Sequence, residues 1–283
     1  MSDYLLGANQ IRKLATKLDI TPTKKLGQNF VIDPNTVRRI IEIAEILPSD
    51  VVVEIGPGLG SLTLGLLAEA KEVIAIEIDP RLAAQLPKTV AEFAEPLKSK
   101  LSVINQDALN VTELPTAPTK LVANLPYNIS VPVLLHFLEQ FPSITQVLVM
   151  VQAEVGERLA AKPGSRIYGV PSVKAQFYAQ AKVVAQISRQ IFWPVPNVDS
   201  VLVSLTRRTE SLDPQIRTQL FAIVDSAFGQ RRKTLRSSLV GYFGDMEKVE
   251  QTLAKAGVDP KLRGEQLSLE DFMRIAKSAK EVK

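Results

Sequence analysis

The stretch Val51-Val52-Val53-Glu54-Ile55-Gly56-Pro57-Gly58-Leu59-Gly60 decides the fold. Its first half is apolar and predicts a buried strand, and the glycines that follow predict a tight turn before a helix. Glycines in such a turn let the backbone approach a ligand closely. The spacing is G-x-G-x-G rather than the G-x-G-x-x-G of dinucleotide sites, and the carboxylate of Glu54 would be an awkward neighbour for a pyrophosphate. The stretch therefore predicts a ligand site that favours a nucleoside over a diphosphate.

Short apolar segments alternate with helical segments on both sides of this stretch. Strands are predicted at residues 51–55, 73–78, 101–104, 121–123 and 147–151, and helices at residues 34–47, 62–70, 81–93 and 131–140. This alternation is typical of a mostly parallel, doubly wound sheet. Later strands at residues 183–187 and 200–205 would add an antiparallel edge. The predicted fold class is therefore α/β with a Rossmann-like sheet.

The two ends of the chain differ from its middle. Residues 4–20 predict an amphipathic helix that leads into a basic turn at residues 21–25. Beyond Arg208 the strand pattern stops, and short helices separated by Gly and Pro are predicted instead. We therefore expect two domains, an α/β domain with a basic N-terminal extension over residues 1–208 and a small all-α domain over residues 209–283.

The composition excludes several kinds of chemistry. The chain has no cysteine, which rules out disulfides and thiolate chemistry, and one histidine, His136, in an apolar helical segment. We interpret His136 as structural, and no metal site is expected. No apolar run is long enough to span a membrane, and the N-terminus lacks an apolar core of the signal-peptide type. A soluble, cytoplasmic protein, with no membrane partner, is the expectation.

Charge is distributed unevenly along the chain. Lys and Arg outnumber Asp and Glu by 7 to 3 in residues 1–39 and by 15 to 11 in residues 206–283. In residues 40–205 the balance reverses, with 12 basic against 16 acidic side chains. Basic flanks around a mildly acidic middle suit a polyanionic partner, although an ordinary solvated surface would give the same counts.

Acidic side chains stand at three successive strand ends. Glu54 lies near the end of the first strand, Glu77 ends the second, and Asp107 follows the third. Glu77 is placed to accept hydrogen bonds from ribose hydroxyls, and Asp107 can accept from an adenine amine. Three acidic groups favour a cationic or neutral nucleoside ligand. S-adenosylmethionine fits this description, whereas NAD fits it less well.

A second decisive stretch, Asn124-Leu125-Pro126-Tyr127-Asn128-Ile129-Ser130, follows the apolar strand at residues 121–123. It places an amide, a rigid turn and an aromatic ring at the carboxyl end of a strand, where open α/β sheets bind ligands. The amide oxygen and the nearby backbone carbonyls can accept hydrogen bonds from the exocyclic amine of a base, and the ring can stack on that base. The alternative is a strand-ending turn with a half-buried Tyr127.

In these stretches the chain resembles the ribosomal RNA adenine N6-dimethyltransferase family. The resemblance covers nearly the whole chain, with six motifs in the family's order. They are Gly27-Gln28-Asn29-Phe30, residues 54–63, Glu77, Gln106-Asp107-Ala108, residues 124–130 and Val195-Pro196-Asn197-Val198-Asp199-Ser200. The resemblance implies S-adenosylmethionine as cofactor, contacted by Asn29, Val31, Gly56, Gly58, Glu77, Asp107 and Asn124. Val31 departs mildly from the family, which commonly has Leu at this position.

The same resemblance implies how the target adenine is held. The Asn124 oxygen and the carbonyl of Leu125 or Pro126 would accept the two hydrogens of N6. Tyr127 would stack on one face of the base and Phe192 on the other. Loop packing is the alternative for Phe192.

The tail points to the small-subunit branch of the family. Residues 227–236 and 263–268 look like that branch, and Arg231, Arg232, Lys233 and Arg236 are the expected RNA contacts, with a solvated basic helix as the alternative. The implied substrate is two adjacent adenines near the 3′ end of small-subunit RNA in an assembling 30S subunit, modified by a monomer. Methylation of large-subunit RNA, a non-catalytic assembly or transcription factor and, more distantly, a nicotinamide dehydrogenase stay open as alternatives.

Overall fold

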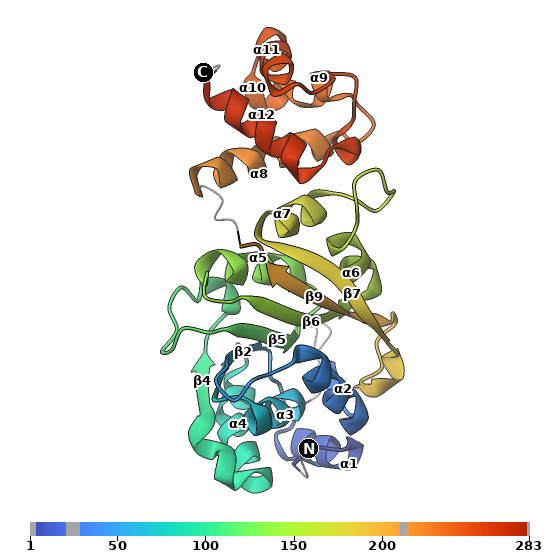
Figure 1. Ribbon diagram of the computed structural model, residues 1–283. Helices are drawn as coiled ribbons and strands as arrows, with labels where there is room; N and C mark the ends of the chain where they lie inside the picture. Colours follow the sequence, from blue (N-terminus) through green and yellow to red (C-terminus); the bar gives the residue numbers. More distant parts are fainter. Residues whose placement is uncertain (1–3, 21–28, 210–213, 282–283) are drawn as a thin grey trace. The chain divides into compact units, whose positions relative to one another are not determined.

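The computed structural model describes residues 4–20, 29–209 and 214–281 (Figure 1). The predicted basic turn at residues 21–25 and the first two residues of the N-terminal motif, Gly27 and Gln28, lie outside these ranges. The chain divides into two compact units. The first comprises Met1–Gly156 and Lys182–Arg207, and the second Glu157–Ala181 and Arg208–Lys283.

A seven-stranded sheet forms the centre of the α/β region, with its strands in the order β4-β3-β2-β5-β6-β9-β7. The strands are β2 (Val51–Ile55), β3 (Glu72–Glu77), β4 (Leu101–Asn105), β5 (Lys120–Asn124), β6 (Gln146–Gln152), β7 (Ala179–Ile187) and β9 (Ser200–Arg207). The pairings from β4 to β6 are parallel, and β9 joins β6 in the antiparallel direction. The sheet confirms the predicted parallel core and its antiparallel edge.

Helices fill the connections between the strands. They are α1 (Ala8–Lys17), α2 (Pro34–Ala44), α3 (Ser61–Glu69), α4 (Pro80–Phe93), α5 (Ser130–Gln140) and α6 (Ala153–Leu159), with 3₁₀ turns at η2 (Glu95–Lys100), η3 (Ala108–Asn110) and η4 (Arg189–Ile191). Asp33 caps α2 as predicted, because its carboxylate accepts from the Asn35 and Thr36 amides at 3.3 and 2.9 Å. The helix ends three residues earlier than predicted, at Ala44, because Glu45 adopts a left-handed conformation.

The order of the strands creates a switch point between β2 and β5. From β2 the chain adds β3 and β4 on one side, and it then returns to add β5 and β6 on the other. The loops that leave β2 and β5 therefore run in opposite directions and leave a crevice at the carboxyl ends of the strands. The glycine turn follows β2, and the turn that begins with Leu125 follows β5.

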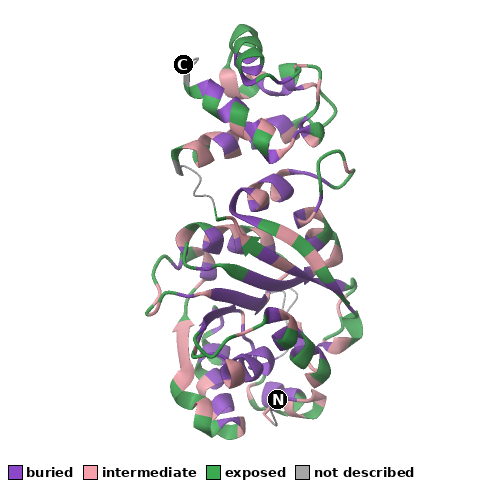
Figure 2. Cartoon of the chain, in the orientation of Figure 1, coloured by how far each residue is buried: buried purple, intermediate pink, exposed green. Residues whose placement is uncertain are grey.

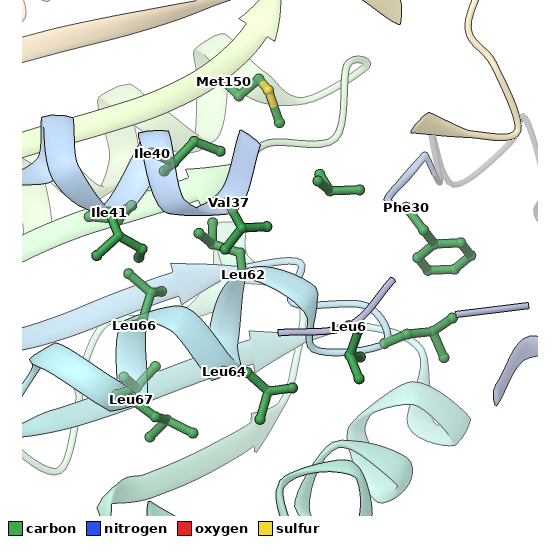
Figure 3. Packing of buried hydrophobic residues seen from close by; sticks show 14 of the residues in the cluster. Leu6, Phe30, Val37, Ile40, Ile41, Leu62, Leu64, Leu66, Leu67 and Met150 are labelled. Atoms are coloured by element: carbon green, nitrogen blue, oxygen red, sulfur yellow. The ribbon is translucent and has the colours of Figure 1, made fainter. Parts of the chain in front are cut away.

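The core lies between the sheet and its helices. The central strands are almost entirely buried (Figure 2). Val37, Ile40 and Ile41 of α2 point toward the leucines of α3 (Figure 3). Burial of this kind contributes about 1.5–3 kcal/mol for each large aliphatic side chain and fixes α3, the helix into which the glycine turn leads.

A small two-stranded sheet was not predicted from the sequence. Its strands, β1 (Phe30–Val31) and β8 (Phe192–Trp193), pair in the antiparallel direction. Two residues are too few to show an alternating pattern, and the partners are far apart in the chain. This pair joins the N-terminal segment to the segment before β9.

The second unit is helical. Its elements are α7 (Val170–Tyr178), α8 (Pro214–Gly229), α9 (Leu235–Ser238), α10 (Val240–Phe243), α11 (Met246–Ala256), η5 (Gly264–Gln266) and α12 (Leu269–Glu281). Its division from the first unit differs from the predicted boundary at residue 208, because residues 157–181 group with the C-terminal helices. The physical reason is that α7 packs on α8 and α12, with Phe177 and Tyr178 edge-on to Phe221.

Candidate active site

A cavity of about 900 Å³, including its open mouth, lies at the carboxyl ends of β2, β3 and β5. All seven residues that the sequence predicted as cofactor contacts line it: Asn29, Val31, Gly56, Gly58, Glu77, Asp107 and Asn124. Leu125, Pro126 and Tyr127 line it too. The structure therefore brings residues from five segments of the chain to one hollow.

The glycine turn lines the cavity, and its three glycines have positive φ angles. Gly56 has φ +68° and Gly58 has φ +58°, which are conformations that side chains disfavour. A Cβ atom on Gly58 would lie 2.9 Å from Cε1 of Phe30, closer than packed carbons approach. The absence of side chains here lets the backbone of the turn lie at the cavity wall, with the Gly56 amide bonded to the Ile76 carbonyl at 2.9 Å and the Gly58 amide to Glu77 at 3.1 Å.

Glu77 is buried at the end of β3, and backbone amides orient it. Oε1 accepts from the Asp79 amide at 3.0 Å and Oε2 from the Gly58 amide at 3.1 Å. Burial raises the pKa of Glu77, whereas these amide hydrogen bonds lower it. A carboxylate has about four acceptor positions, so two remain for ligand hydroxyls.

Glu54 is fully buried beneath the same cavity. Oε2 accepts from the Thr63 hydroxyl at 2.6 Å. Burial raises the pKa of Glu54 to about 8, against the hydrogen bond from Thr63, and the charge of Glu77 adds to the rise. Glu54 therefore holds a proton near neutral pH, and a cationic ligand nearby would favour its ionised form.

Asp107 stands at the third corner of the cavity as the N-cap of η3. Its Oδ1 accepts from the Leu109 amide at 2.9 Å, which fixes the direction of the carboxylate. The acceptor capacity that remains is suited to an exocyclic amine, as the sequence predicted.

Asn124 ends β5 and has its two amide atoms in different environments. Nδ2 donates to the Asn29 carbonyl at 3.1 Å. Oδ1 is buried, and within the described residues it has no hydrogen-bond partner. Since an unpaired buried acceptor costs about 1–3 kcal/mol, a ligand donor is the natural partner for this oxygen.

The turn after Asn124 contains a second candidate acceptor. The Leu125 amide donates to the Met150 carbonyl at 3.1 Å, and the Pro126 carbonyl accepts from the Ile129 amide at 3.2 Å. Among the described residues, none donates to the Leu125 carbonyl. Of the two carbonyls that the sequence left open, that of Leu125 is therefore the better candidate.

Tyr127 is held by a residue to which the sequence assigned no role. Its hydroxyl lies 2.7 Å from Oγ of Ser200, which is completely buried at the start of β9. Burial raises the pKa of Tyr127, the hydrogen bond with Ser200 lowers it, and the nearby Asp199 raises it further. Ser200 was visible in the sequence as the last residue of a motif, but only the fold shows its partner.

Phe192 is packed in the core of the structure. It is 1% exposed, belongs to the hydrophobic core, and is not among the cavity-lining residues. The pairing of β8 with β1 places Trp193 rather than Phe192 against the ring of Phe30. The stacking of Phe192 on the target base stays a prediction.

The predicted RNA contacts fall into two pairs. Arg231 binds Oε2 of Glu265 at 2.7 Å and the Tyr168 carbonyl at 3.1 Å, and Arg236 binds Glu250 at 2.5 Å. Arg231 and Arg236 thus have partners inside the helical unit. Arg232 and Lys233 are exposed, and neither has an ion pair with any residue that the structure describes. The two pairs cannot be told apart in the sequence, where all four residues belong to one basic stretch.

His136 is part of the scaffold, as interpreted from the sequence. Its Nε2 lies 2.8 Å from the Val111 carbonyl, which ties α5 to the segment after η3. Within the described ranges, no cluster of three or more His, Asp or Glu side chains is arranged to hold a metal ion. No helix in those ranges is both long and apolar enough to cross a membrane.

Comparison with known families places this geometry in context. The model for "Ribosomal RNA adenine dimethylase" matches residues 21–281, which is nearly the whole chain. The chain belongs to the ribosomal RNA adenine dimethylase family. Membership confirms the resemblance seen in the six sequence motifs.

Relatives within this dimethylase family are similar over their full length. The ribosomal RNA small subunit methyltransferase A of Leifsonia xyli subsp. xyli is 58% identical over 273 residues, which cover 96% of this chain and 98% of the relative. The protein of the same name from Corynebacterium efficiens is 57% identical, and the match covers 96% of this chain and 96% of the relative. The one from Streptomyces avermitilis is also 57% identical, and the match covers 98% of this chain and 94% of the relative.

Solved structures show that the fold is that of a methyltransferase. A dimethyladenosine transferase from Plasmodium falciparum superposes with a TM-score of 0.74 at 26% identity, covering 86% of this chain and 94% of its own. The 23S rRNA methyltransferase ErmE gives 0.67 at 29% identity, covering 89% of this chain and all of its own. The predicted Rossmann-like sheet with a helical C-terminal region is therefore confirmed.

Proposed function

We propose that this dimethylase family member methylates N6 of two adjacent adenines in a hairpin near the 3′ end of small-subunit ribosomal RNA, in an assembling 30S subunit. The observation that carries the proposal is the unpaired, buried Oδ1 of Asn124 at the switch-point cavity. An adenine amine is a donor of the right kind for it. The small-subunit choice is supported by relatives named for that subunit at 55–58% identity.

The cavity residues fit S-adenosylmethionine, which supplies a methyl group on a sulfonium ion when bound. Glu77 would accept from the ribose hydroxyls, and Asp107 from the adenine amine of the cofactor. Glu54, beneath the glycine turn, would provide negative charge near the cationic part. The unpaired acceptor and the three acidic groups together match the donors and charges of this molecule.

The residues of the second turn would orient the target amine. An adenine N6 is a poor nucleophile because its lone pair is delocalised into the ring. If Asn124 Oδ1 and the Leu125 carbonyl each accept one of its hydrogens, the nitrogen is drawn toward tetrahedral geometry and its lone pair points into the cavity. Positioning and local electrostatics would then supply most of the acceleration, with no strong base required.

Tyr127 would hold the target base once it has left its stack. Its hydroxyl is fixed by Ser200, so the plane of the ring is set before the substrate arrives. Stacking of a base on an aromatic ring is worth about 1–3 kcal/mol. Tyr127 lines the cavity, whereas Phe192 is buried in the core, so the proposal rests on Tyr127 and stacking by Phe192 stays a prediction.

In the helical unit, Arg232 and Lys233 are the candidates for contact with RNA phosphates. Both are exposed, and neither is engaged by a described acidic residue. Each such contact would release a counterion from the RNA, so affinity should fall with salt.

The experiment that tests this function supplies labelled S-adenosylmethionine to the purified chain, with unmethylated small subunits and large-subunit RNA in parallel. We expect dimethyladenosine at two neighbouring positions near the 3′ end of the small-subunit RNA. Label confined to large-subunit RNA would overturn the choice of substrate, and cofactor binding without label in either RNA would overturn catalysis in favour of an assembly factor.

A further inference from the structure

The turn at residues 194–199 is attached to the wall of the cavity at both of its ends. Before the turn, Trp193 pairs with Phe30 in the small sheet, and their rings stack with centroids 6.2 Å apart. After the turn, Ser200 bonds to the Tyr127 hydroxyl at 2.7 Å. Phe30 and Tyr127 both line the cavity. The turn is therefore fastened at both ends to residues that line the cavity.

Hydrogen bonds brace the turn internally. Asp199 accepts from the Arg189 amide through Oδ1 at 3.0 Å and from the Ala153 amide through its carbonyl at 3.0 Å. The Arg189 guanidinium donates to the Asn197 carbonyl at 3.2 Å. Two prolines, Pro194 and Pro196, further restrict the backbone. Its tip is thus presented in a defined position.

The tip of the turn is apolar and faces solvent. Val195 is 57% exposed and Val198 is 45% exposed. Seven large hydrophobic side chains are exposed in the described part of the chain, and two of them fall within these six residues. Single exposed aliphatic residues need no explanation, but a pair on a braced turn beside a ligand cavity points to a contact with a partner.

We propose that Val195 and Val198 form an apolar rim that packs on the RNA bases flanking the adenine delivered into the cavity. The inference rests on the proposed function, because it names what the same site does to the neighbours of its target. When a base leaves its stack, the faces of the adjacent bases lose their partner, and apolar side chains can take its place. The absence of charge at the tip suits base faces rather than phosphates.

The test replaces both valines by serine. It measures the unstacking of the target base separately from methyl transfer. The substrate is a small-subunit RNA hairpin that carries 2-aminopurine at one target adenine, bound in the presence of S-adenosylhomocysteine, and the fluorescence of 2-aminopurine reports loss of stacking. We expect Val195→Ser together with Val198→Ser to lower the fluorescence gain. On unlabelled hairpin, the KM for RNA should rise about fivefold for each valine that loses its partly buried contact. The affinity for S-adenosylmethionine should stay unchanged.

Val184→Ser is the matched control, since Val184 is 41% exposed on β7, away from the turn. It should leave both fluorescence and KM unchanged. The rim is disproved if the double variant matches the wild type in both measurements, or if Val184→Ser produces the same loss. Methylation by the wild type in the same assay checks the proposed function separately, so failure of the rim and failure of that function are distinguishable.

Discussion

The two ends of the parallel strands carry opposite kinds of side chain. At the amino ends, Lys120 donates from Nζ to the Ala44 and Glu45 carbonyls at 2.9 and 2.6 Å, at the end of α2. Lys100 likewise binds the last carbonyls of α3 at 3.2 and 2.9 Å. Arg207, at the end of the antiparallel β9, binds carbonyls at and beyond the end of α5.

The carboxyl ends of the same strands carry Glu54, Glu77, Asp107 and Asn124. At the amino ends the lysine ammonium groups donate hydrogen bonds to carbonyls at the ends of helices, where a positive charge also interacts favourably with the helix dipole. At the carboxyl ends the acceptors are oriented by hydrogen bonds to backbone groups or, for Glu54, to the Thr63 hydroxyl, and they keep capacity for a ligand. The amino ends of the strands thus carry residues that stabilise the fold, and the carboxyl ends carry residues that can bind a ligand. Variants at the amino ends should therefore change the free energy of unfolding, and variants at the carboxyl ends should change turnover.

The largest expected effect is at the carboxyl ends. Asn124→Ala should lower kcat by about 10²–10³, because it removes an oriented acceptor for the target amine, comparable to the loss of one oxyanion-hole donor. The affinity for S-adenosylmethionine and the melting temperature should change little. Turnover on small subunits, with cofactor affinity from calorimetry, is the measurement. Near-normal turnover would exclude the proposed role of Asn124.

At the amino ends, Lys120→Met should instead lower stability and leave turnover nearly unchanged. Lys120 is buried, and Asp50 Oδ2 lies 3.4 Å from its Nζ, so the variant leaves a carboxylate and two carbonyls without their donor. We expect a loss of about 3 kcal/mol in the free energy of unfolding, measured in urea, with kcat per folded molecule retained. Lys71→Met, at an exposed lysine, is the control and should cost almost nothing.

Two variants of Tyr127 distinguish the stacking of its ring on the target base from the hydrogen bond of its hydroxyl to Ser200. Tyr127→Ala should reduce kcat/KM for RNA by about 5–150-fold, the equivalent of 1–3 kcal/mol of stacking. Tyr127→Phe keeps the ring and loses only the hydrogen bond to Ser200, so a loss of about fivefold is expected. Steady-state kinetics on hairpin RNA give both values. Equal losses in the two variants would assign the role to the hydroxyl.

A pH dependence of stability is also expected for the empty protein. Because the pKa of Glu54 is raised from 4.5 to about 8, the folded state holds more protons than the unfolded state between these values. The contribution of Glu54 to stability is therefore complete below about pH 4.5 and is lost as the pH rises toward 8, at no more than about 1.4 kcal/mol per pH unit. Glu54→Gln should flatten this part of the profile in urea unfolding. An unchanged slope would contradict the raised pKa.

The sequence predicted the carboxyl-end site well for a physical reason. Glu77, Asp107 and Asn124 each follow an apolar strand, and the ends of parallel strands meet at one edge whatever the packing elsewhere. Asn29 and Val31 were found only through the family resemblance, since a two-residue strand has no readable period. The core packing of Phe192 was not visible in the sequence for the same reason, because its partner in β1 is distant in the chain.

The amino-end cations escaped prediction because lysine in a sequence indicates a surface position. Lys120 instead starts a central strand and is buried by the helix that it caps. Arg231 was predicted to contact RNA because it belongs to a basic run, and that contact stays a prediction. The structure adds that Arg231 binds the Tyr168 carbonyl and Glu265. In both residues the cation is satisfied by backbone carbonyls, and which carbonyls lie nearby depends on the tertiary fold.

The Asn124 side chain bonds to the N-terminal segment through Nδ2 and leaves Oδ1 for a ligand, so the N-terminal segment influences how the target amine is held. A carboxamide is a rigid plane, so the direction of Oδ1 is dictated by where Nδ2 is anchored. That anchor is the Asn29 carbonyl, and the same segment is fastened two residues later by the Ser61 hydroxyl, 2.6 Å from the Val31 carbonyl. Aspartate at position 124 would set a negative oxygen against that carbonyl, so only an amide can face both ways. The N-terminal segment therefore determines the direction of Asn124 Oδ1, although its hydrogen bond is to Nδ2.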